Sequence, residues 1–396
     1  MDVAPPDAIV VGLGAVGSAV CHYLSKSGAK VVGIDRFRPP HDQGSSHGLT
    51  RITRLAVGEG AAFVPLAMRS HELWRELEAA SGESLYRRTG GLIVASEAAG
   101  PNAFHGQAGF FDQTIALAQR FGIGHELLDA ASIRERFPAF LATDGDRGYL
   151  EPDAGVLFPE RIVAAQLQQA ERHGAVLRLG ERVLGIEPNG GAVSVRTERG
   201  RLSAARVIVA AGAWMPALGA AALAGRLRVL RQVLLWFHAA EPALFDPERC
   251  PVFIWLHATG AAGSMYGFPM IDGVAGVKAA SEQDTLECEP DRIDREVTGA
   301  EASAVFERHL RGRLRGLTSQ LVRAATCLYT STADASFLVR PHPGSDAITF
   351  VSACSGHGFK HSAALGEAIA QQVRGEAPSV SLEAFTELRR PATPAA

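Results

Sequence analysis

Apolar and polar positions change their period several times along this chain of 396 residues. An apolar run at 8–11 enters a glycine-rich turn at 12–17, a stretch with helical spacing follows, and a second apolar run at 31–35 ends in an acid. Short apolar runs on either side of an amphipathic helix are typical of buried parallel strands. The beginning of the chain therefore predicts a β–turn–α–β unit.

Two late segments repeat the start of this pattern. The run 207–211 leads into a glycine turn at Gly212, and the run 348–353 leads into a glycine-containing turn and a helix predicted from about 362 to 373. Strands of the same kind at both ends of a chain indicate one domain interrupted by insertions. We therefore expect a discontinuous domain with a parallel sheet.

The remaining periodic segments complete the predicted elements. Residues 226–275 are rich in strand formers and aromatic residues, the composition expected of a sheet that packs over a ligand. Helices are predicted at 63–80, over most of 111–137, at 159–174 and over about 291–314. Strands are predicted at 91–95, 176–179, 182–186 and 193–196.

These elements predict an α/β protein, α+β in its two-domain arrangement. A Rossmann-like domain is interrupted by a substrate domain built on an antiparallel sheet. The Rossmann-like domain is predicted to comprise residues 1–86, 150–220 and 328–388. The substrate domain is predicted to comprise 87–149 and 221–327, and 389–396 are predicted to form a loose tail.

Composition narrows the functional classes. A hydrophobic content of 47% and a charged content of 20% are typical of soluble globular proteins. The net charge of −3 and the lack of basic runs argue against nucleic-acid and membrane partners. The N-terminus does not resemble a signal peptide, and no apolar run reaches about 18 residues. Five cysteines without CxxC spacing argue against disulfides or a metal site, so we expect a cytoplasmic protein.

The glycine turn of the first unit carries chemistry. Gly12 allows a tight turn, Gly14 lets the backbone approach a pyrophosphate, and Gly17 lets the helix pack close to the strand. The helix N-terminus offers N–H groups to phosphates, and Asp35 can accept hydrogen bonds from a ribose diol. The unit therefore predicts dinucleotide binding, against the alternative of a turn made only for packing.

A second helix N-terminus is predicted at the mouth of the sheet, in the turn 356–360. Such a terminus can hold the negative charge that a reduced flavin acquires. Segments from both ends of the chain also suit an elongated cofactor. Both features favour FAD over NAD, although spacing alone leaves a nicotinamide-dependent dehydrogenase with a catalytic His or Lys open.

Five motifs, in order along nearly the whole chain, carry a resemblance to a known family. They are 12–17 with Asp35, 39–54, 266–269 with Lys278, 327–330 and 355–360. With these motifs the chain resembles the monomeric sarcosine oxidase family, which includes N-methyltryptophan oxidase and pipecolate oxidase, within the D-amino-acid-oxidase-like flavoproteins.

The resemblance implies that the Rossmann-like domain binds FAD. Cys327 matches the residue that bonds the flavin 8α-methyl carbon as a thioether, although the residue alone could equally be a small core cysteine. The family also contacts FAD through backbone near Val183 and Gly212. The implied FAD-binding residues are Gly12, Gly14, Gly17, Asp35, Thr50, Val183, Gly212, Cys327, Gly356, His357, Gly358 and Lys360.

The same resemblance implies three catalytic residues, Lys278, Arg51 and His47. Lys278 matches the oxygen-activating lysine, whose ammonium stabilises a developing superoxide-like anion. Arg51 and His47 match basic residues near the isoalloxazine ring. The residues alone leave a solvated lysine, a surface salt bridge and a turn histidine open.

Substrate binding is implied for two further pairs. Arg54 and Lys360 match the pair that binds the substrate carboxylate, with Arg as a bidentate fork and Lys as a point charge. Tyr266 and Tyr329 match aromatic residues that line the substrate cavity, and core packing is the alternative for each.

Two positions depart from the sarcosine-type pattern. Glu282 stands four residues after Lys278, where sarcosine-type members have a histidine, and Trp255 brings a bulky ring to the pocket segment. We expect both to contact substrate: Glu282 by facing a second cationic group, or Trp255 by packing against a cyclic imino acid. A solvated loop acid is the alternative for Glu282.

The implied function is an FAD-dependent oxidase of a secondary or N-methyl amino acid that reduces O2 to hydrogen peroxide. The amine must be neutral, so burial should lower its pKa, and no side-chain base is required. A monomer is expected by the same resemblance. The alternatives are a flavin-dependent dehydrogenase that passes electrons to a quinone or protein, an NAD-dependent dehydrogenase, and a flavin-binding protein without turnover.

Overall fold

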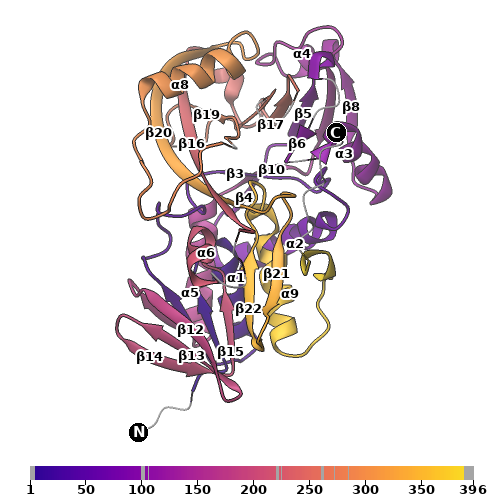
Figure 1. Ribbon diagram of the computed structural model, residues 1–396. Helices are drawn as coiled ribbons and strands as arrows, with labels where there is room; N and C mark the ends of the chain where they lie inside the picture. The colour runs from indigo at the N-terminus through magenta and orange to yellow at the C-terminus, as the bar shows by residue number, and fades with distance from the viewer. Residues whose placement is uncertain are drawn as a thin grey trace, which may run out of the picture.

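The computed structural model describes residues 5–99, 103–105, 107–219, 223, 225–259, 263–271, 273–283 and 285–387. Figure 1 shows two lobes, and the lower one contains segments from both ends of the chain, coloured indigo and yellow. The upper lobe contains segments from the middle of the chain. The predicted tail at 389–396 lies outside the described residues.

The lower lobe contains a six-stranded sheet whose edge strand is antiparallel and whose other strands are parallel. In register, Ala8 pairs with Val31 on one side and Arg206 on the other. Both termini of the chain therefore contribute to one sheet, as the repeated pattern predicted. Its strands, in spatial order, are β11 (Val176–Leu179), β2 (Val31–Asp35), β1 (Ala8–Val11), β15 (Arg206–Val209), β22 (Ser345–Ser352) and β21 (Leu338–His342).

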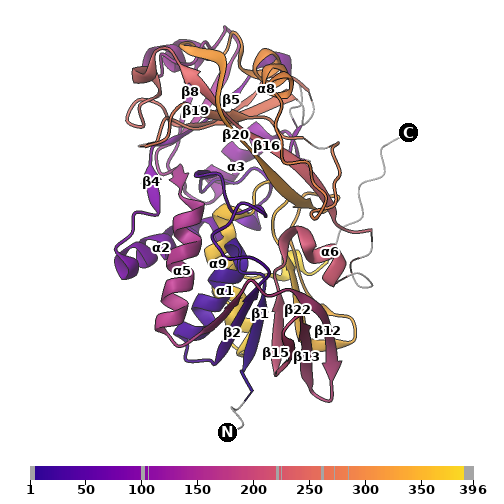
Figure 2. The same cartoon turned by 90° about the vertical axis from the view of Figure 1, so that its left-hand side faces the viewer.

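The side chains of β1 point alternately to the two faces of this sheet, and each face is covered by a different layer. Ala8 and Val10 belong to a core shared with helices, whereas Ile9 and Val11 belong to a core shared with a small sheet. Figure 2 shows these two layers on opposite faces. The helices are α1 (Ala15–Lys26), α5 (Pro159–Arg172) and α9 (Ser362–Val373), and the small sheet is β12 (Val183–Asn189), β13 (Ala192–Thr197) and β14 (Gly200–Ala204).

The upper lobe is built on an eight-stranded sheet. All neighbouring strands run antiparallel except one pair, in which Val252 is in register with Gly91. The prediction of an antiparallel sheet is thus correct apart from this parallel pair. The strands, in spatial order, are β20 (Leu317–Ser331), β16 (Arg228–Ala239), β19 (Val277–Ala280), β18 (Ser264–Gly267), β17 (Val252–Leu256), β5 (Gly91–Ala95), β9 (Arg147–Glu151) and β8 (Glu126–Asp129).

Short elements connect the lobes. A three-stranded sheet is formed by β3 (Arg51–Thr53), β10 (Gly155–Leu157) and β4 (Tyr86–Arg88), and a hairpin by β6 (Ala103–Phe104) and β7 (Gln107–Ala108). The other α-helices are α2 (Phe63–Ser81), α3 (Phe110–Arg120), α4 (Ala130–Arg136), α6 (Met215–Leu218) and α8 (Gly299–Val305). The 3-10 turns are η1 (Glu97–Ala99), η2 (Gly212–Trp214), η3 (Pro242–Phe245), η6 (Phe359–His361) and η7 (Glu383–Phe385), and η5 (Phe306–Leu310) is a π-helix turn.

The long periodic elements are where the sequence placed them. The predicted helices at 63–80, 159–174 and 362–373 are α2, α5 and α9, and the predicted strand at 91–95 is β5. Strong periodicity and buried apolar positions explain this agreement.

Two predicted helices were wrong in extent. The segment 111–137 contains the edge strand β8 between α3 and α4, because its residues pair with β9. A new helix then begins at Asp129, whose side chain accepts a hydrogen bond from the Ser132 N–H. The segment 291–314 becomes helical only after Thr298, whose hydroxyl accepts from the Glu301 N–H.

Three of the predicted domain boundaries fall inside strands. The limits at 86/87, 149/150 and 327/328 cut β4, β9 and β20. Within the part of the chain that the structure describes, no helix has the length and apolar character needed to span a membrane. The same residues contain no group of three His, Cys, Asp or Glu side chains arranged to hold a metal ion.

Candidate active site

A cavity of about 270 Å³ runs between the lobes, from the glycine turn after β1 to the turn before α9. Strands β1, β2, β15 and β22 all end at it, so it lies at the carboxyl edge of the parallel sheet, where ligands bind in such folds. Its walls in the upper lobe come from β16, β18, β19 and β20. The location alone makes it the candidate site.

The glycine turn is shaped for close backbone approach. Gly12 has a φ of +86°, and a Cβ on it would lie 2.5 Å from the Ala210 carbonyl oxygen. A Cβ on Gly17 would lie 1.7 Å from the Gly12 oxygen, so only glycine allows α1 to pack this closely. Gly14 lines the cavity and directly precedes α1. Gly12 and Gly17 therefore meet the packing needs of this turn, and the approach of Gly14 to a pyrophosphate stays a prediction.

Asp35 ends β2 at the same edge of the sheet. Its carboxylate accepts the Leu13 N–H at 2.7 Å and the Phe37 N–H at 2.7 Å, which fixes the side chain beside the glycine turn. Val183 and Gly212 also line this half of the cavity. The backbone edges, the N-terminus of α1 and the fixed acid together fit the ADP half of a dinucleotide.

Lys278 lies at the other half of the cavity, on β19. Its Nζ donates to Gly48 O at 2.8 Å, Thr50 O at 3.0 Å and Thr50 Oγ1 at 3.2 Å, and it lies 4.8 Å from the Phe268 ring centre. Burial, and then the Arg51 charge, lower the pKa of Lys278 well below its usual range. The three oxygens around Nζ match the three hydrogens of an ammonium.

The loop that holds Lys278 is itself fixed by a carboxylate. Glu160, in the first turn of α5, accepts the N–H groups of Gly48 at 2.7 Å and Leu49 at 3.0 Å. Leu49 has a φ of +70° and Gly48 a φ of +96°, so this left-handed turn needs such an external acceptor. Glu160 thereby orients the carbonyl oxygens that bind Lys278.

Arg51 and Cys327 meet in the same region. Arg51 donates to Thr50 O at 2.8 Å and to Ser45 O at 2.6 Å, and its Nη2 lies 3.8 Å from the Cys327 Sγ. Cys327 lies on β20, is fully buried and lines the cavity. Burial raises the pKa of the Cys327 thiol, although Arg51 acts in the opposite direction.

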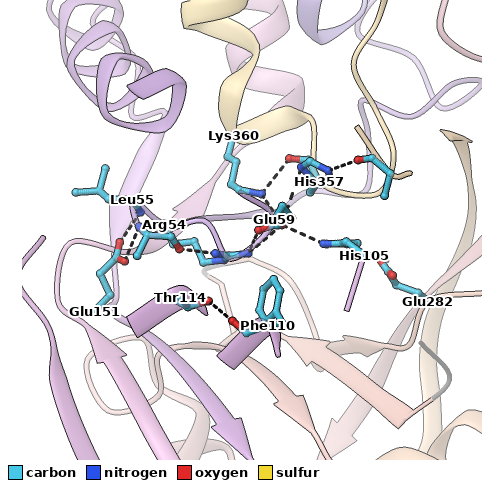
Figure 3. A network of polar contacts seen from close by, with 12 residues as sticks. Arg54, Leu55, Glu59, His105, Phe110, Thr114, Glu151, Glu282, His357 and Lys360 are labelled. Carbon is cyan, nitrogen blue, oxygen red and sulfur yellow. Dashed lines mark hydrogen bonds and ion pairs between the residues drawn. The ribbon is translucent and has the colours of Figure 1, made fainter. Parts of the chain in front are cut away.

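Figure 3 shows a buried network around Glu59 at the far end of the cavity. Arg54 holds the Glu59 carboxylate as a bidentate pair, at 2.9 Å and 2.7 Å. The Lys360 ammonium lies 3.4 Å from Glu59 Oε1 and 3.1 Å from the His357 carbonyl oxygen. The two cations predicted to bind a carboxylate therefore converge on one carboxylate, which the protein itself supplies.

His105 extends this network to Glu282. Its Nδ1 lies 3.0 Å from Glu59 Oε1, and its Nε2 forms a very short hydrogen bond with Glu282 Oε1. His105 is at the tip of the β6–β7 hairpin, and Glu282 follows β19, so both come from the upper lobe. Gly356 leaves room for them, because a Cβ on it would lie 2.7 Å from Glu282 Oε1.

Electrostatic coupling shifts the pKa values of this network. Burial would raise the pKa of the Glu59 carboxyl, but Arg54 and Lys360 outweigh burial and hold that pKa well below its usual range. Burial would lower the pKa of His105, but Glu282 and Glu59 outweigh it and raise that pKa. Burial lowers the pKa of Lys360 to about 8, although Glu59 opposes the shift.

A second carboxylate supports Arg54 from behind. Glu151 on β9 accepts the Leu55 N–H at 2.5 Å (Figure 3). It also accepts the Ala56 N–H at 3.0 Å and the Tyr149 hydroxyl at 3.0 Å. Arg54 in turn donates to the Ala56 carbonyl oxygen. Glu151 therefore fixes the segment that presents the guanidinium.

Two tyrosines form the wall between these groups. Tyr266 on β18 and Tyr329 on β20 line the cavity and share a hydrogen bond. Burial raises the pKa of Tyr266 to about 12 and that of Tyr329 well above its usual range, so both are neutral phenols. An aromatic wall of this kind suits a small organic ligand.

Not every predicted site residue lines the cavity. Trp255 packs on Phe140 in the core of the upper lobe and donates to Ser96 Oγ at 3.0 Å, because its position on β17 faces away from the cavity. The structure therefore contradicts its predicted contact with substrate. His47 and Gly17 lie behind the cavity wall, and burial lowers the pKa of His47 to about 4.

The remaining predicted residues come together around the cavity. They are Gly12, Gly14, Asp35, Thr50, Arg51, Arg54, Val183, Gly212, Tyr266, Lys278, Glu282, Cys327, Tyr329, Gly356, His357, Gly358 and Lys360. The sequence patterns did not point to Glu59, His105, Glu151 or Glu160. For Glu59 a signal existed, since an acid between Gly58 and Gly60 close to Arg54 suits a loop at a site.

Comparisons with known proteins agree with this site. A family model described as FAD dependent oxidoreductase matches residues 7–372. A protein named monomeric sarcosine oxidase from Streptomyces avermitilis is 37% identical over 98% of this chain and 99% of its own. A protein named N-methyl-L-tryptophan oxidase from Salmonella heidelberg is 30% identical over 96% of this chain and 97% of its own.

Solved structures share the fold. The open form of NikD, named as an amino acid oxidase of nikkomycin biosynthesis, has a TM-score of 0.82 at 22% identity over 97% of this chain and 98% of its own. L-proline dehydrogenase from P. horikoshii has a TM-score of 0.79 at 21% identity over 96% of both chains. The family match covers both lobes and all the segments that line the cavity, and the chain belongs to the FAD-dependent oxidoreductases of the sarcosine oxidase type.

Proposed function

We propose that this protein is an FAD-dependent oxidase of secondary or N-methyl α-amino acids that reduces O2 to hydrogen peroxide. The observation that carries the proposal is the convergence of Arg54 and Lys360 on the Glu59 carboxylate, inside a cavity continuous with the glycine turn. A site that holds one buried carboxylate with two cations can hold that of a substrate. The relatives named for N-methyl amino acids support the same class.

The residues present fit FAD along the whole cavity. Gly12, Gly14 and Asp35 would hold the ADP half, and Thr50 and the Gly356–Gly358 backbone would hold the flavin half. Bound FAD would supply two-electron oxidation of the carbon next to the amine nitrogen. Cys327, which is buried and lines the cavity beside Arg51, is proposed to hold the flavin as a thioether.

The protein's own residues account for the other requirements. Arg54 and Lys360 orient the carboxylate, and Tyr266 and Tyr329 exclude water from the amine. Burial lowers the pKa of an amine, so a dry site favours the neutral form that can be oxidised. In its protonated form, which the three oxygens around Nζ favour, Lys278 would provide a cation where O2 gains negative charge.

One preparation tests these points together. The purified protein is precipitated with acid: a yellow pellet over a colourless supernatant is expected, and Cys327→Ser should release the colour into the supernatant. Soluble protein is then offered N-methylated and cyclic amino acids while hydrogen peroxide and oxygen uptake are measured. Turnover with an artificial electron acceptor but no peroxide would instead support a dehydrogenase. A colourless protein would refute the proposal.

Two further expectations, on oligomeric state and cellular compartment, belong to the same proposal. A monomer is expected from the name of the monomeric sarcosine oxidase relatives, and light scattering at several protein concentrations tests it. A reducing cytoplasm suits the five free cysteines, of which Cys21, Cys250 and Cys327 are buried.

A further inference from the structure

The loop that binds Lys278 contains a strained turn. The Thr50 N–H donates to Gly48 O at 2.8 Å, and Leu49 between them has a φ of +70°. A three-residue turn with this hydrogen bond and a positive φ at its centre is a γ-turn of the rare, strained kind. Such a conformation persists only where its surroundings hold it. The question is therefore which residue holds this turn.

The peptide group between Gly48 and Leu49 is held at both ends. Its N–H, which belongs to Leu49, donates to Glu160 Oε1 at 3.0 Å. Its carbonyl oxygen, which belongs to Gly48, accepts from Lys278 Nζ at 2.8 Å. A carboxylate at one end of a peptide dipole and an ammonium at the other strengthen each other's hydrogen bonds. One peptide group therefore connects Glu160 to Lys278.

The fold brings Glu160 to this turn through one pair of strands. β3 and β10 are antiparallel, with Arg51 in register with Leu157. The same register, continued past these two residues, sets Glu160 opposite Gly48, whose N–H donates to the same Oε1 at 2.7 Å. Glu160 itself lies in the first turn of α5. Its position is thus fixed by a strand pair and a helix, not by the loop that it contacts.

Glu160 is also the anion nearest to this group of cations. The titratable side chains coupled to Lys278 in the part of the chain that the structure describes are His47, Arg51, Glu160, Arg323 and Cys327. Burial lowers the pKa of His47 to about 4 and raises that of the Cys327 thiol, so both are neutral. Burial, and then Arg51, lower the pKa of Lys278, whereas the Glu160 carboxylate acts in the opposite direction.

We propose that Glu160 is a positioning residue for the reaction of the reduced flavin with O2: it holds the turn at 48–50, so that the carbonyl oxygens of Gly48 and Thr50 keep the Lys278 ammonium in place. The inference rests on the proposed function. Reoxidation passes two electrons to O2, which takes up two protons to form hydrogen peroxide. The oxygen is negative before those protons arrive, and a displaced cation stabilises it less.

Two substitutions separate the hydrogen bonds of Glu160 from its charge. Glu160→Gln keeps an oxygen that can accept both N–H groups and removes the negative charge, whereas Glu160→Ala removes the acceptor as well. The holoenzyme is reduced with light and EDTA, so that no substrate is needed, and its reoxidation by O2 is followed by flavin absorbance in a stopped-flow instrument. Glu160→Ala should slow reoxidation about ten-fold or more, and Glu160→Gln should slow it less.

The Kd of propanoate for the oxidised holoenzyme shows whether the rest of the site is intact, and it should be unchanged in both variants. The proposal is wrong if Glu160→Ala reoxidises at the wild-type rate, or if it changes the Kd by as large a factor as it changes the rate. It is also wrong if Glu160→Gln is as slow as Glu160→Ala, since the charge alone would then explain the effect.

Combination with Lys278→Met shows whether Glu160 acts through Lys278. If Glu160 only positions this ammonium, Glu160→Ala should slow the wild type but have no effect once the ammonium is gone. The double variant should therefore reoxidise at the rate of Lys278→Met. A double variant that is slower than Lys278→Met by the factor that separates Glu160→Ala from the wild type would overturn the proposal.

A second readout follows Lys278 itself and does not depend on turnover. The chain has four lysines, Lys26, Lys30, Lys278 and Lys360, so NMR of protein labelled with 13C at the lysine Cε gives few signals. The signal missing from Lys278→Met is that of Lys278. Its pH titration in the oxidised holoenzyme should have the highest midpoint in the wild type, a lower one in Glu160→Gln and the lowest in Glu160→Ala.

Equal midpoints in the wild type and in Glu160→Ala would show that Glu160 does not hold the oxygens around the ammonium, and would overturn the proposal. Failure of the proposed function looks different. If no amino acid yields hydrogen peroxide with the wild type, that function is wrong, while reoxidation of the photoreduced enzyme and the titration of Lys278 still decide the role of Glu160.

Glu78 provides a matched control. Its Oε1 also accepts two consecutive N–H groups, those of Leu85 at 2.8 Å and Tyr86 at 3.0 Å, and none of these three residues lines the cavity. Glu78→Ala should leave the rate of reoxidation and the titration of Lys278 unchanged. A loss of rate equal to that of Glu160→Ala would show that removal of any such carboxylate slows the reaction, and would overturn the proposal.

Discussion

Lys360 makes the binding of a carboxylate depend on pH. Burial lowers the pKa of Lys360 to about 8, so its ammonium is present below that pH and is lost above it. A carboxylate such as propanoate stays ionised throughout this range. Its affinity for the oxidised holoenzyme should therefore be highest below pH 8 and should fall as the pH rises through 8.

The size of the effect can be worked from the Lys360–Glu59 pair, taken as the measure of how Lys360 attracts a carboxylate in this cavity. At the 3.4 Å between Lys360 Nζ and Glu59 Oε1, the gross attraction is about 5 kcal/mol at an effective dielectric constant of about 20. Desolvation cancels much of it, and a charge-assisted hydrogen bond contributes about 1.5–3 kcal/mol net. The Kd of propanoate should rise about 10- to 60-fold between pH 6 and 10.

The assay is a titration of propanoate followed by flavin absorbance at a series of pH values. Lys360→Arg separates Lys360 from other groups, because a guanidinium keeps its charge up to pH 10. The variant should show a Kd that is nearly independent of pH, apart from any contribution of His105. If Lys360→Arg weakens through pH 8 as much as the wild type does, the reasoning about Lys360 is refuted.

Three further predictions concern other parts of the site. Lys278→Met should slow flavin reoxidation by O2 at least about 100-fold and leave anaerobic reduction by substrate nearly unchanged, which stopped-flow spectroscopy measures separately. Glu151→Ala leaves the N–H groups of Leu55 and Ala56 without their acceptor, so the free energy of unfolding should fall by about 1–3 kcal/mol, measured in urea. Gly17→Ala should abolish flavin incorporation, since its Cβ would lie 1.7 Å from a carbonyl oxygen, and a normal absorbance spectrum would contradict this.

The sequence predicts best those features whose residues lie within one element or one turn. The glycine turn, Asp35 and the long helices α2, α5 and α9 were found because their patterns lie within one element. Weak edge elements were missed, and β8 is an example: its residues look helical but pair with β9 at the edge of a sheet. Tertiary pairing overrides local propensity there.

The charged side chains of the site show the same limit. Arg54 and Lys360 could be named from their motifs, but their partner Glu59 and its contact His105 could not. His105 lies 46 residues from Glu59 and 177 from Glu282, and only the packing of the two lobes brings the three together. The prediction for Trp255 was wrong because the face to which a strand side chain points depends on register, which the sequence leaves open.

The charged network around Glu59 is divided between the two lobes. Arg54 follows β3, and Lys360 lies in the turn before α9. Both share these loops with residues proposed to hold FAD. His105 and Glu282 come from a hairpin and a strand end of the upper lobe. A substitution at His105 therefore removes a contact to Glu59 without removing the two cations beside that carboxylate. We expect it to change the binding of a substrate more than the incorporation of flavin.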